Sequence, residues 1–191
     1  MKVDFLKQPG KRPLALSLIL GGALFRLIPH PVNLAPIGAM SLFAGARLKG
    51  WQSYAVPLII IAITDPIMGL LLGYPAFTAV TPVVCASFLI YVWIGSRLRA
   101  TENLWKIGGA ALLGGTQFFL ISNFGMWASG LSYPLTASGL WTCYLVGIPY
   151  FGRTLLADLF YAGILFGLHA WLSRRAFPDE RVRKDLLTAP S

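Results

Sequence analysis

Two side chains in this sequence are suited to binding a transition metal, Cys85 and His30. Cys85 is the sixth residue of the apolar stretch VTPVVCASFLIY, and His30 stands between two prolines in IPHPVN. A soft thiolate and an imidazole are good ligands for a transition metal if they lie at the same depth. A structural role is open for each as well, because buried cysteines often act as small apolar side chains. No CxxC, HExxH or paired-histidine spacing accompanies them, so spacing alone predicts no metal site.

The composition indicates that these side chains are positioned by membrane helices. Of the 191 residues, 56% are hydrophobic and only 12% are charged. A soluble domain usually carries about 25% charged residues. Long apolar runs separated by short basic stretches are typical of a polytopic membrane protein. No linker or repeat divides the sequence, so residues 1–191 are expected to form one domain.

The predicted fold is an all-α integral membrane protein, a bundle of six transmembrane helices. The second segment is the weakest because it is short and holds the small-residue run GAMSLFAGA, which favours close packing of helices. The expected segments are about 14–29, 34–48, 54–73, 79–96, 106–124 and 153–173.

Lysine and arginine residues predict the orientation. They gather at the N-terminus, after the second and fourth segments and in the C-terminal tail, which are alternate connections of a six-segment chain. The positive-inside rule then places both termini in the cytoplasm. The net charge of +9 follows from this topology, so nucleic-acid binding need not be invoked.

The outward connections are aromatic and almost uncharged. The third, residues 123–152, is the longest, and its prolines discourage continuous helix, so we expect an irregular segment that caps or lines a cavity. An interfacial belt of Trp and Tyr is the alternative. Tyr91 lies about 600° around the helix from Cys85, so it need not share the cysteine's face. The candidate lining residues are Asn33, Tyr91, Trp127, Tyr133 and Tyr144.

Ionisable residues within the apolar segments require partners, because a charge in hydrocarbon is costly. Arg26 and Asp65 are expected to pair between the outer halves of the first and third segments. Asp65 or Asp158 could be the proton relay of a carrier, or each could belong to a neutralised structural pair. The sequence holds no GxxxxGK[ST] loop and no Gly-x-Ser-x-Gly elbow, so neither ATP hydrolysis by that route nor a hydrolase is supported.

Several motifs carry a resemblance to a known family. The stretches RLIPHPVNLAPIGAMSLFAGA, QFFLISNFGMW and GIPYFGRTLLADLFY are distributed over nearly the whole chain. With six short segments and a basic N-terminus, the sequence resembles the S components of energy-coupling-factor (ECF) vitamin transporters. It is most similar to the solitary, BtuM-like S components for cobalamin, within a wider bacterial membrane family.

This resemblance implies a cobalamin transporter of the bacterial inner membrane. Cys85 would be the cobalt ligand through its thiolate, and His30 would lie on or near the opposite axial face. Thiolate coordination would also displace the cyano ligand of cyanocobalamin. The other partners would be the lipid bilayer and either an ECF coupling subunit with its ATPases or, for a solitary protein, none. GAMSLFAGA could be the docking face for that subunit or tight internal packing. A proton-coupled carrier for another small molecule and a membrane assembly protein remain alternatives.

Overall fold

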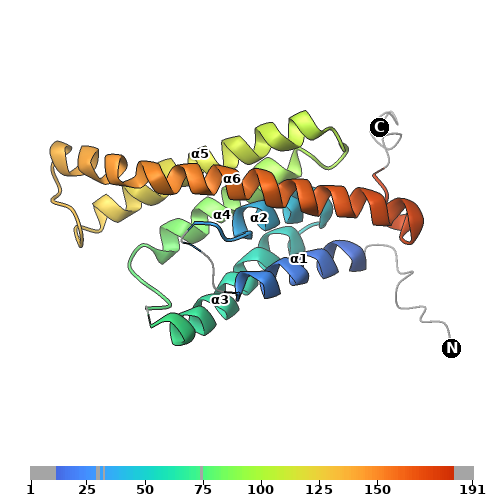
Figure 1. Ribbon diagram of the computed structural model, residues 1–191, viewed down its shortest axis with the longest axis horizontal. Coiled ribbons are helices and arrows are strands. Elements are labelled where there is room, and N and C mark those ends of the chain that lie inside the picture. The colour runs from blue at the N-terminus through green and yellow to red at the C-terminus, as the bar shows by residue number, and fades with distance from the viewer. Residues whose placement is uncertain (1–11, 29–30, 32, 74, 183–191) are drawn as a thin grey trace.

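Six α-helices packed side by side make up most of the described chain (Figure 1). The computed structural model describes residues 12–28, 31, 33–73 and 75–182, and these contain no β-strand. A short 3-10 helix, Pro178–Glu180, follows the last α-helix. The α-helices are α1 (Pro13–Arg26), α2 (Ile37–Arg47), α3 (Gln52–Leu72), α4 (Thr81–Ser96), α5 (Leu104–Ala128) and α6 (Ala137–Arg175).

Three of these helices, α3, α5 and α6, are long and apolar enough to cross a membrane. Helices α1 and α4 are shorter but also apolar. Large apolar side chains cover the outside of the bundle, such as Leu70 on α3 and Trp171 on α6, which are 87% and 51% exposed. Such an outer surface is suited to contact with lipid chains and not with water. The expected all-α fold is confirmed, and the three long apolar helices are compatible with a membrane protein.

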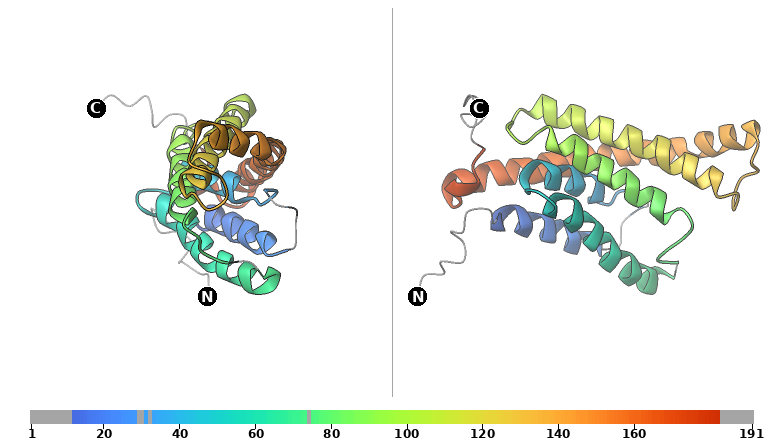
Figure 2. Two further views of the ribbon diagram at one scale, coloured as in Figure 1. Left: turned by 90° about the vertical axis from the view of Figure 1, so that its left-hand side faces the viewer. Right: turned by 180° about the vertical axis from the view of Figure 1, so that it is seen from behind.

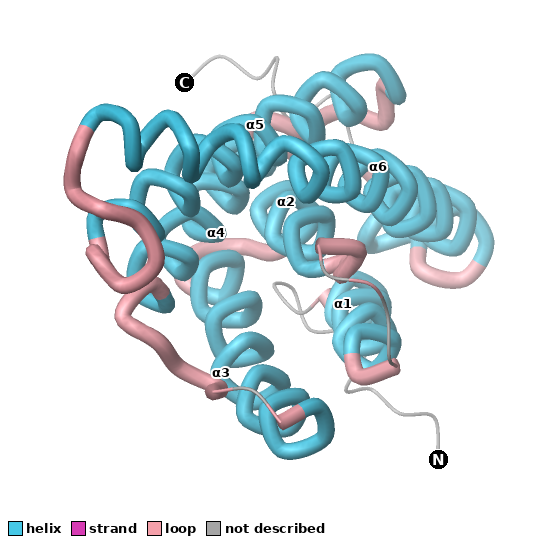
Figure 3. Tube along the Cα trace, turned by 60° about the vertical axis from the view of Figure 1, so that its left-hand side comes forward, coloured by secondary structure: helices cyan, strands magenta, loops and turns pink. Residues whose placement is uncertain are grey.

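Helix α2 lies inside the bundle and contacts each of the other five helices (Figure 3). All eleven of its residues are buried. It approaches α4 closely, because a Cβ atom at Gly45 would collide with the carbonyl oxygen of Val92, and one at Gly95 with that of Leu42. The small residues of GAMSLFAGA therefore serve internal packing, one of the two roles that the sequence left open.

Helix α2 is only about half as long as the hydrocarbon core of a bilayer is thick. Its 11 residues correspond to a length of about 16 Å, against a hydrocarbon thickness of about 30 Å. The segment expected at 34–48 is therefore too short to cross a bilayer as a helix. Residues 33–36, directly before α2, are irregular and not helical, so the space beyond the N-terminus of α2 is lined by side chains of other helices as well.

The expectation of a long irregular segment over residues 123–152 is wrong. Helix α5 continues to Ala128 and α6 begins at Ala137, so the two helices form a hairpin that projects beyond the rest of the bundle (Figure 2). The Thr136 hydroxyl starts α6 by accepting the backbone N–H of Gly139 at 3.1 Å. Pro149 lies within α6, and apolar helices tolerate such a proline because neighbouring groups satisfy the freed carbonyl.

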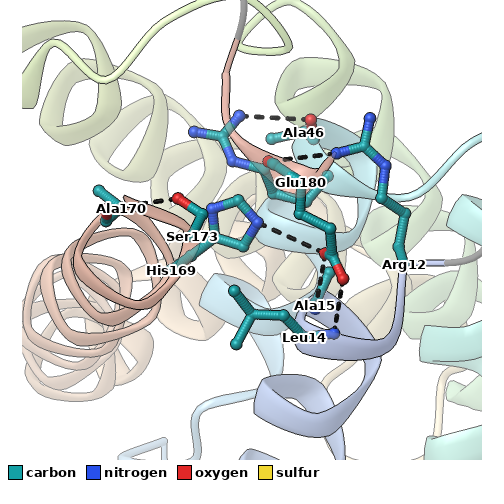
Figure 4. A network of polar contacts seen from close by, with 9 residues as sticks. Arg12, Leu14, Ala15, Ala46, His169, Ala170, Ser173 and Glu180 are labelled. Carbon is teal, nitrogen blue, oxygen red and sulfur yellow. Dashed lines mark hydrogen bonds and ion pairs between the residues drawn. The ribbon is translucent and has the colours of Figure 1, made fainter. Parts of the chain in front are cut away.

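A buried carboxylate joins the two ends of the described chain (Figure 4). Glu180 is 2% exposed and accepts the backbone N–H groups of Leu14 and Ala15 at 2.7 and 3.1 Å. Arg12 donates to its backbone carbonyl at 3.3 Å, and Nε2 of His169 lies 3.7 Å from its carboxylate. Burial alone would raise the pKa of Glu180, but the His169 side chain and the N–H groups of Leu14 and Ala15 outweigh it and hold the pKa below its ordinary value. Glu180 therefore caps α1 and fixes the end of α6 beside it.

Candidate functional site

A cavity of about 420 Å³ lies beyond the N-terminus of α2. Its size is within the usual range for small-molecule sites, about 300–1,000 Å³. Every α-helix contributes to its lining, and the side chains are mostly apolar. The polar and charged side chains in the lining are Arg26, Asn33, Asp65, Tyr91, Thr154 and Asp158.

A second cavity of about 320 Å³ adjoins the first. The two share Asn33, Val84, Phe118 and Thr154 in their linings, so they lie side by side, and the two cavities together form the hollow. The second part lies mainly between α5 and α6 and includes Tyr133 and Cys143. The hollow therefore extends from the interior of the bundle into the projecting hairpin.

The floor of the first cavity is formed by Asp158 of α6 and Tyr91 of α4, which are 2% and 1% exposed. The Tyr91 hydroxyl donates to Oδ2 of Asp158 at 2.5 Å, and the backbone N–H of Ala39 donates to the same carboxylate. Ala39 lies in the first turn of α2, where the backbone N–H groups have no partner within the helix. Asp158 is thus held at the positive end of the α2 dipole.

Gly38 is required at this floor. A Cβ atom there would collide with Oδ1 of Asp158 and lie 3.0 Å from the Tyr91 hydroxyl. The start of α2 can approach the carboxylate only because this position lacks a side chain.

An ion pair forms one wall of the cavity. Nη2 of Arg26 lies 2.6 Å from Oδ1 of Asp65, which confirms the predicted pair between the first and third segments. Arg26 also donates to the hydroxyl of Thr64 on α3. The charges of Arg26 and Asp65 offset each other, so Asp158 is the acidic side chain of the lining that faces no paired cation among the described residues.

Cys85 lies in the second turn of α4, at the edge of this cavity. Its neighbours Val84 and Phe88 line the cavity, whereas Cys85 is partly exposed and packs against the apolar core. A residue next to Val84 is turned about 100° around the helix, which accounts for this position. Cys85 and Cys143 are both free thiols, so the structure holds no disulfide between them.

The other predicted lining residues fall into two groups. Tyr91 and Asn33 line the first cavity and Tyr133 lines the second, and Asn33 has a left-handed backbone with φ 65°. Trp127 and Tyr144 line neither. His30 lies outside the described residues.

The positions of Trp127 and Tyr144 have a local explanation. The Trp127 indole donates to the carbonyl of Pro134 at 3.0 Å and so closes the α5–α6 turn. The Tyr144 hydroxyl donates to the carbonyl of Leu120 at 2.8 Å, between the two helices of the hairpin. Both polar tips are therefore used within the hairpin.

Phe88, Phe118 and Thr154 line the cavity but are absent from the predicted set. The spacing of Val84, Phe88 and Tyr91 is the helical period of one face and could have identified Phe88. Phe118 and Thr154 have no comparable signal in the sequence. Among the described residues, no group of three or more His, Cys, Asp or Glu side chains is placed to hold a metal ion.

Comparison with known proteins adds one finding to this geometry. No curated protein and no solved structure matches the chain. The model of a family of unknown function, DUF6580, matches residues 7–181. The match covers most of the sequence, and the chain therefore belongs to the DUF6580 family.

Proposed function

We propose that this protein is a membrane transporter that binds cobalamin from the outer side, in the hollow beyond α2. The observation that carries the proposal is the hollow itself, a mostly apolar space beyond the N-terminus of the short helix α2, whose few polar groups converge from different helices. This is the usual composition of a site for a large uncharged or amphiphilic ligand.

The proposed topology has six crossings and both termini in the cytoplasm of a bacterium, with the protein in the inner membrane. Arg12 and Glu180 are in contact, which supports an even number of crossings. The second crossing would consist of the irregular stretch before α2 and α2 itself. Non-helical backbone is tolerated at membrane depth where it lines a cavity, and Asn33 and Ala35 of that stretch do so.

Cobalamin suits the chemistry of this lining. The edge of the corrin ring carries amides, which can bond to Asn33 and Thr154, and aromatic walls such as Phe88 and Phe118 can pack on its faces. Cobalamin is bulky, so both parts of the hollow would be occupied. Coordination of cobalt by Cys85 requires the thiol to turn past Val84 into the hollow.

The burial of α2 favours a solitary transporter. In an S component that docks on a coupling subunit, exposed small-residue helix faces supply the contact. Here the run GAMSLFAGA is enclosed by the other helices, so that run is not available to an ECF coupling subunit. The proposal therefore does not require an ATPase module.

The visible spectrum of detergent-purified protein incubated with cyanocobalamin tests the proposal, because cobalamin reports its axial ligands by colour. We expect bound corrinoid with a shifted spectrum and loss of the cyano ligand. The shift should disappear in Cys85→Ala and persist in the matched control Cys143→Ala. Corrinoid that binds to Cys85→Ala with an identical spectrum would remove Cys85 as cobalt ligand. Colourless wild-type protein would overturn the cobalamin assignment and favour a carrier for another small molecule.

A further inference from the structure

We propose that Asp158 and Tyr91 form a proton-binding site at the floor of the cavity, and that proton binding there drives transport. The proton site stands on the geometry alone, whereas its coupling to transport rests on the proposed function. The inference supplies the energy source that a transporter without an ATPase module needs.

The Asp158 carboxylate has no neighbouring cation among the described residues. The charged or titratable groups facing it across the cavity are Tyr91 on α4, Arg26 on α1 and Asp65 on α3. Arg26 is already 2.6 Å from Asp65. Arg153, one turn and a half earlier on α6, stacks on Tyr150 with 5.8 Å between its guanidinium carbon and the ring centroid.

The remaining elements around Asp158 offer only backbone. Helix α2 presents Gly38 and the N–H of Ala39, and α5 presents Gly115, where a Cβ atom would lie 3.2 Å from Oδ2 of Asp158. A carboxylate in a membrane-spanning segment without a paired cation is a candidate for a functional group. The simplest way for it to lose its charge is to bind a proton.

Both the charged and the neutral form of the Asp158 carboxyl have hydrogen-bond partners. The carboxylate accepts from the Tyr91 hydroxyl at 2.5 Å and from Ala39 at the start of α2. When a proton from bulk solvent binds one carboxyl oxygen, the new O–H can donate to water or to a ligand in the cavity, while the other oxygen accepts from the Tyr91 hydroxyl as before. The Tyr91 hydroxyl therefore keeps an acceptor in both states.

Protons have access to Asp158 from one side of the bundle. Asp158 lines a cavity whose upper lining includes exposed residues such as Leu72, so protons can reach it from that side. On the other side α2 is packed on all faces and its residues are buried. Release of the proton to the opposite side therefore requires the helices around α2 to move, which is the condition for coupling a proton to alternating access.

Infrared difference spectroscopy of the purified protein between high and low pH tests the proton site without any ligand. We expect a protonated-carboxyl band in the wild type, its loss in Asp158→Asn and a shifted titration midpoint in Tyr91→Phe. The matched control Glu180→Gln should keep the band, because Glu180 is buried away from the cavity. A band that Asp158→Asn leaves unchanged, or a Tyr91→Phe midpoint equal to the wild type, would overturn the proposal.

Uptake of cyanocobalamin by proteoliposomes tests the coupling. We expect a pH gradient to drive uptake, a protonophore to abolish it, and Asp158→Asn to lose gradient-driven uptake while still binding cyanocobalamin. Gradient-driven uptake by Asp158→Asn at the wild-type rate would refute the coupling. The two proposals can fail separately: an Asp158 band without cyanocobalamin binding removes the substrate, and binding without that band removes the proton site.

Discussion

Two buried carboxylates in this molecule use the same local chemistry in different surroundings. Glu180 accepts N–H groups at the start of α1, and Asp158 accepts one at the start of α2. Each is 2% exposed. Neither α1 nor α2 has a side-chain cap from its own preceding residue, so in both cases a distant carboxylate supplies the missing acceptor.

The difference between them is what lies on the other side of the carboxylate. Glu180 is enclosed by backbone, Arg12 and His169, and it lines neither part of the hollow. Asp158 faces the cavity. Burial and helix capping alone therefore do not distinguish a structural carboxylate from a functional one. The two carboxylates are distinguished by access to a cavity, which Asp158 has and Glu180 does not.

The largest expected effect is the loss of stability in Glu180→Ala. The substitution leaves the buried N–H groups of Leu14 and Ala15 without their acceptor and removes the carboxylate that lies 3.7 Å from His169, which should cost about 3 kcal/mol. Asp158→Ala should cost only about 1 kcal/mol, because water in the cavity can replace the carboxylate. Thermal unfolding of both variants in one detergent measures the contrast. Equal losses would show that the two environments are energetically alike.

The next largest effect should come from Gly38→Ala, which disturbs only the Asp158 side of the comparison. The added methyl would collide with Asp158 and crowd Tyr91, and overpacking of this kind costs about 1–3 kcal/mol. Gly21→Ala is the matched control, since no atom lies within 4 Å of a Cβ built there. We expect a lower melting temperature for Gly38→Ala alone. A melting temperature equal to that of Gly21→Ala would mean that the start of α2 can move away freely.

The sequence predicted the helices better than the floor of the cavity. The apolar runs were sufficient to predict the all-α fold. The need of a charged side chain for a partner was sufficient to predict the Arg26–Asp65 pair. Both follow from the cost of polar groups in hydrocarbon. The prolines of residues 123–152 were misleading, since Pro149 is accommodated within α6. Proline restricts a helix less where neighbouring helices can satisfy the freed carbonyl.

The central role of α2 could not be read from its residues. GAMSLFAGA permits close packing in any direction, and only the approach of Gly45 to Val92 shows which helix it packs against. For the same reason the contact between Asp158 and Ala39, 119 residues apart by their numbers, has no local signal. Cavity floors built from several helices depend on such long-range contacts.

The smallest expected effect is the acid dependence of stability that Glu180 contributes. Its pKa in the folded protein is held below its ordinary value because the donors from α1 and His169 outweigh the effect of burial. A lowered pKa means that the unfolded state binds a proton first as the pH falls. The stabilisation is therefore present above the pKa of the unfolded carboxyl and is lost as the pH falls through the folded pKa. We expect the wild-type melting temperature to drop more steeply than that of Glu180→Gln between about pH 6 and about pH 3. If the melting temperatures of the wild type and Glu180→Gln fall in parallel as the pH drops, other groups cause the acid sensitivity. Glu180 would then cap α1 without its charge adding to stability, and it would differ from Asp158 only in its lack of access to the cavity.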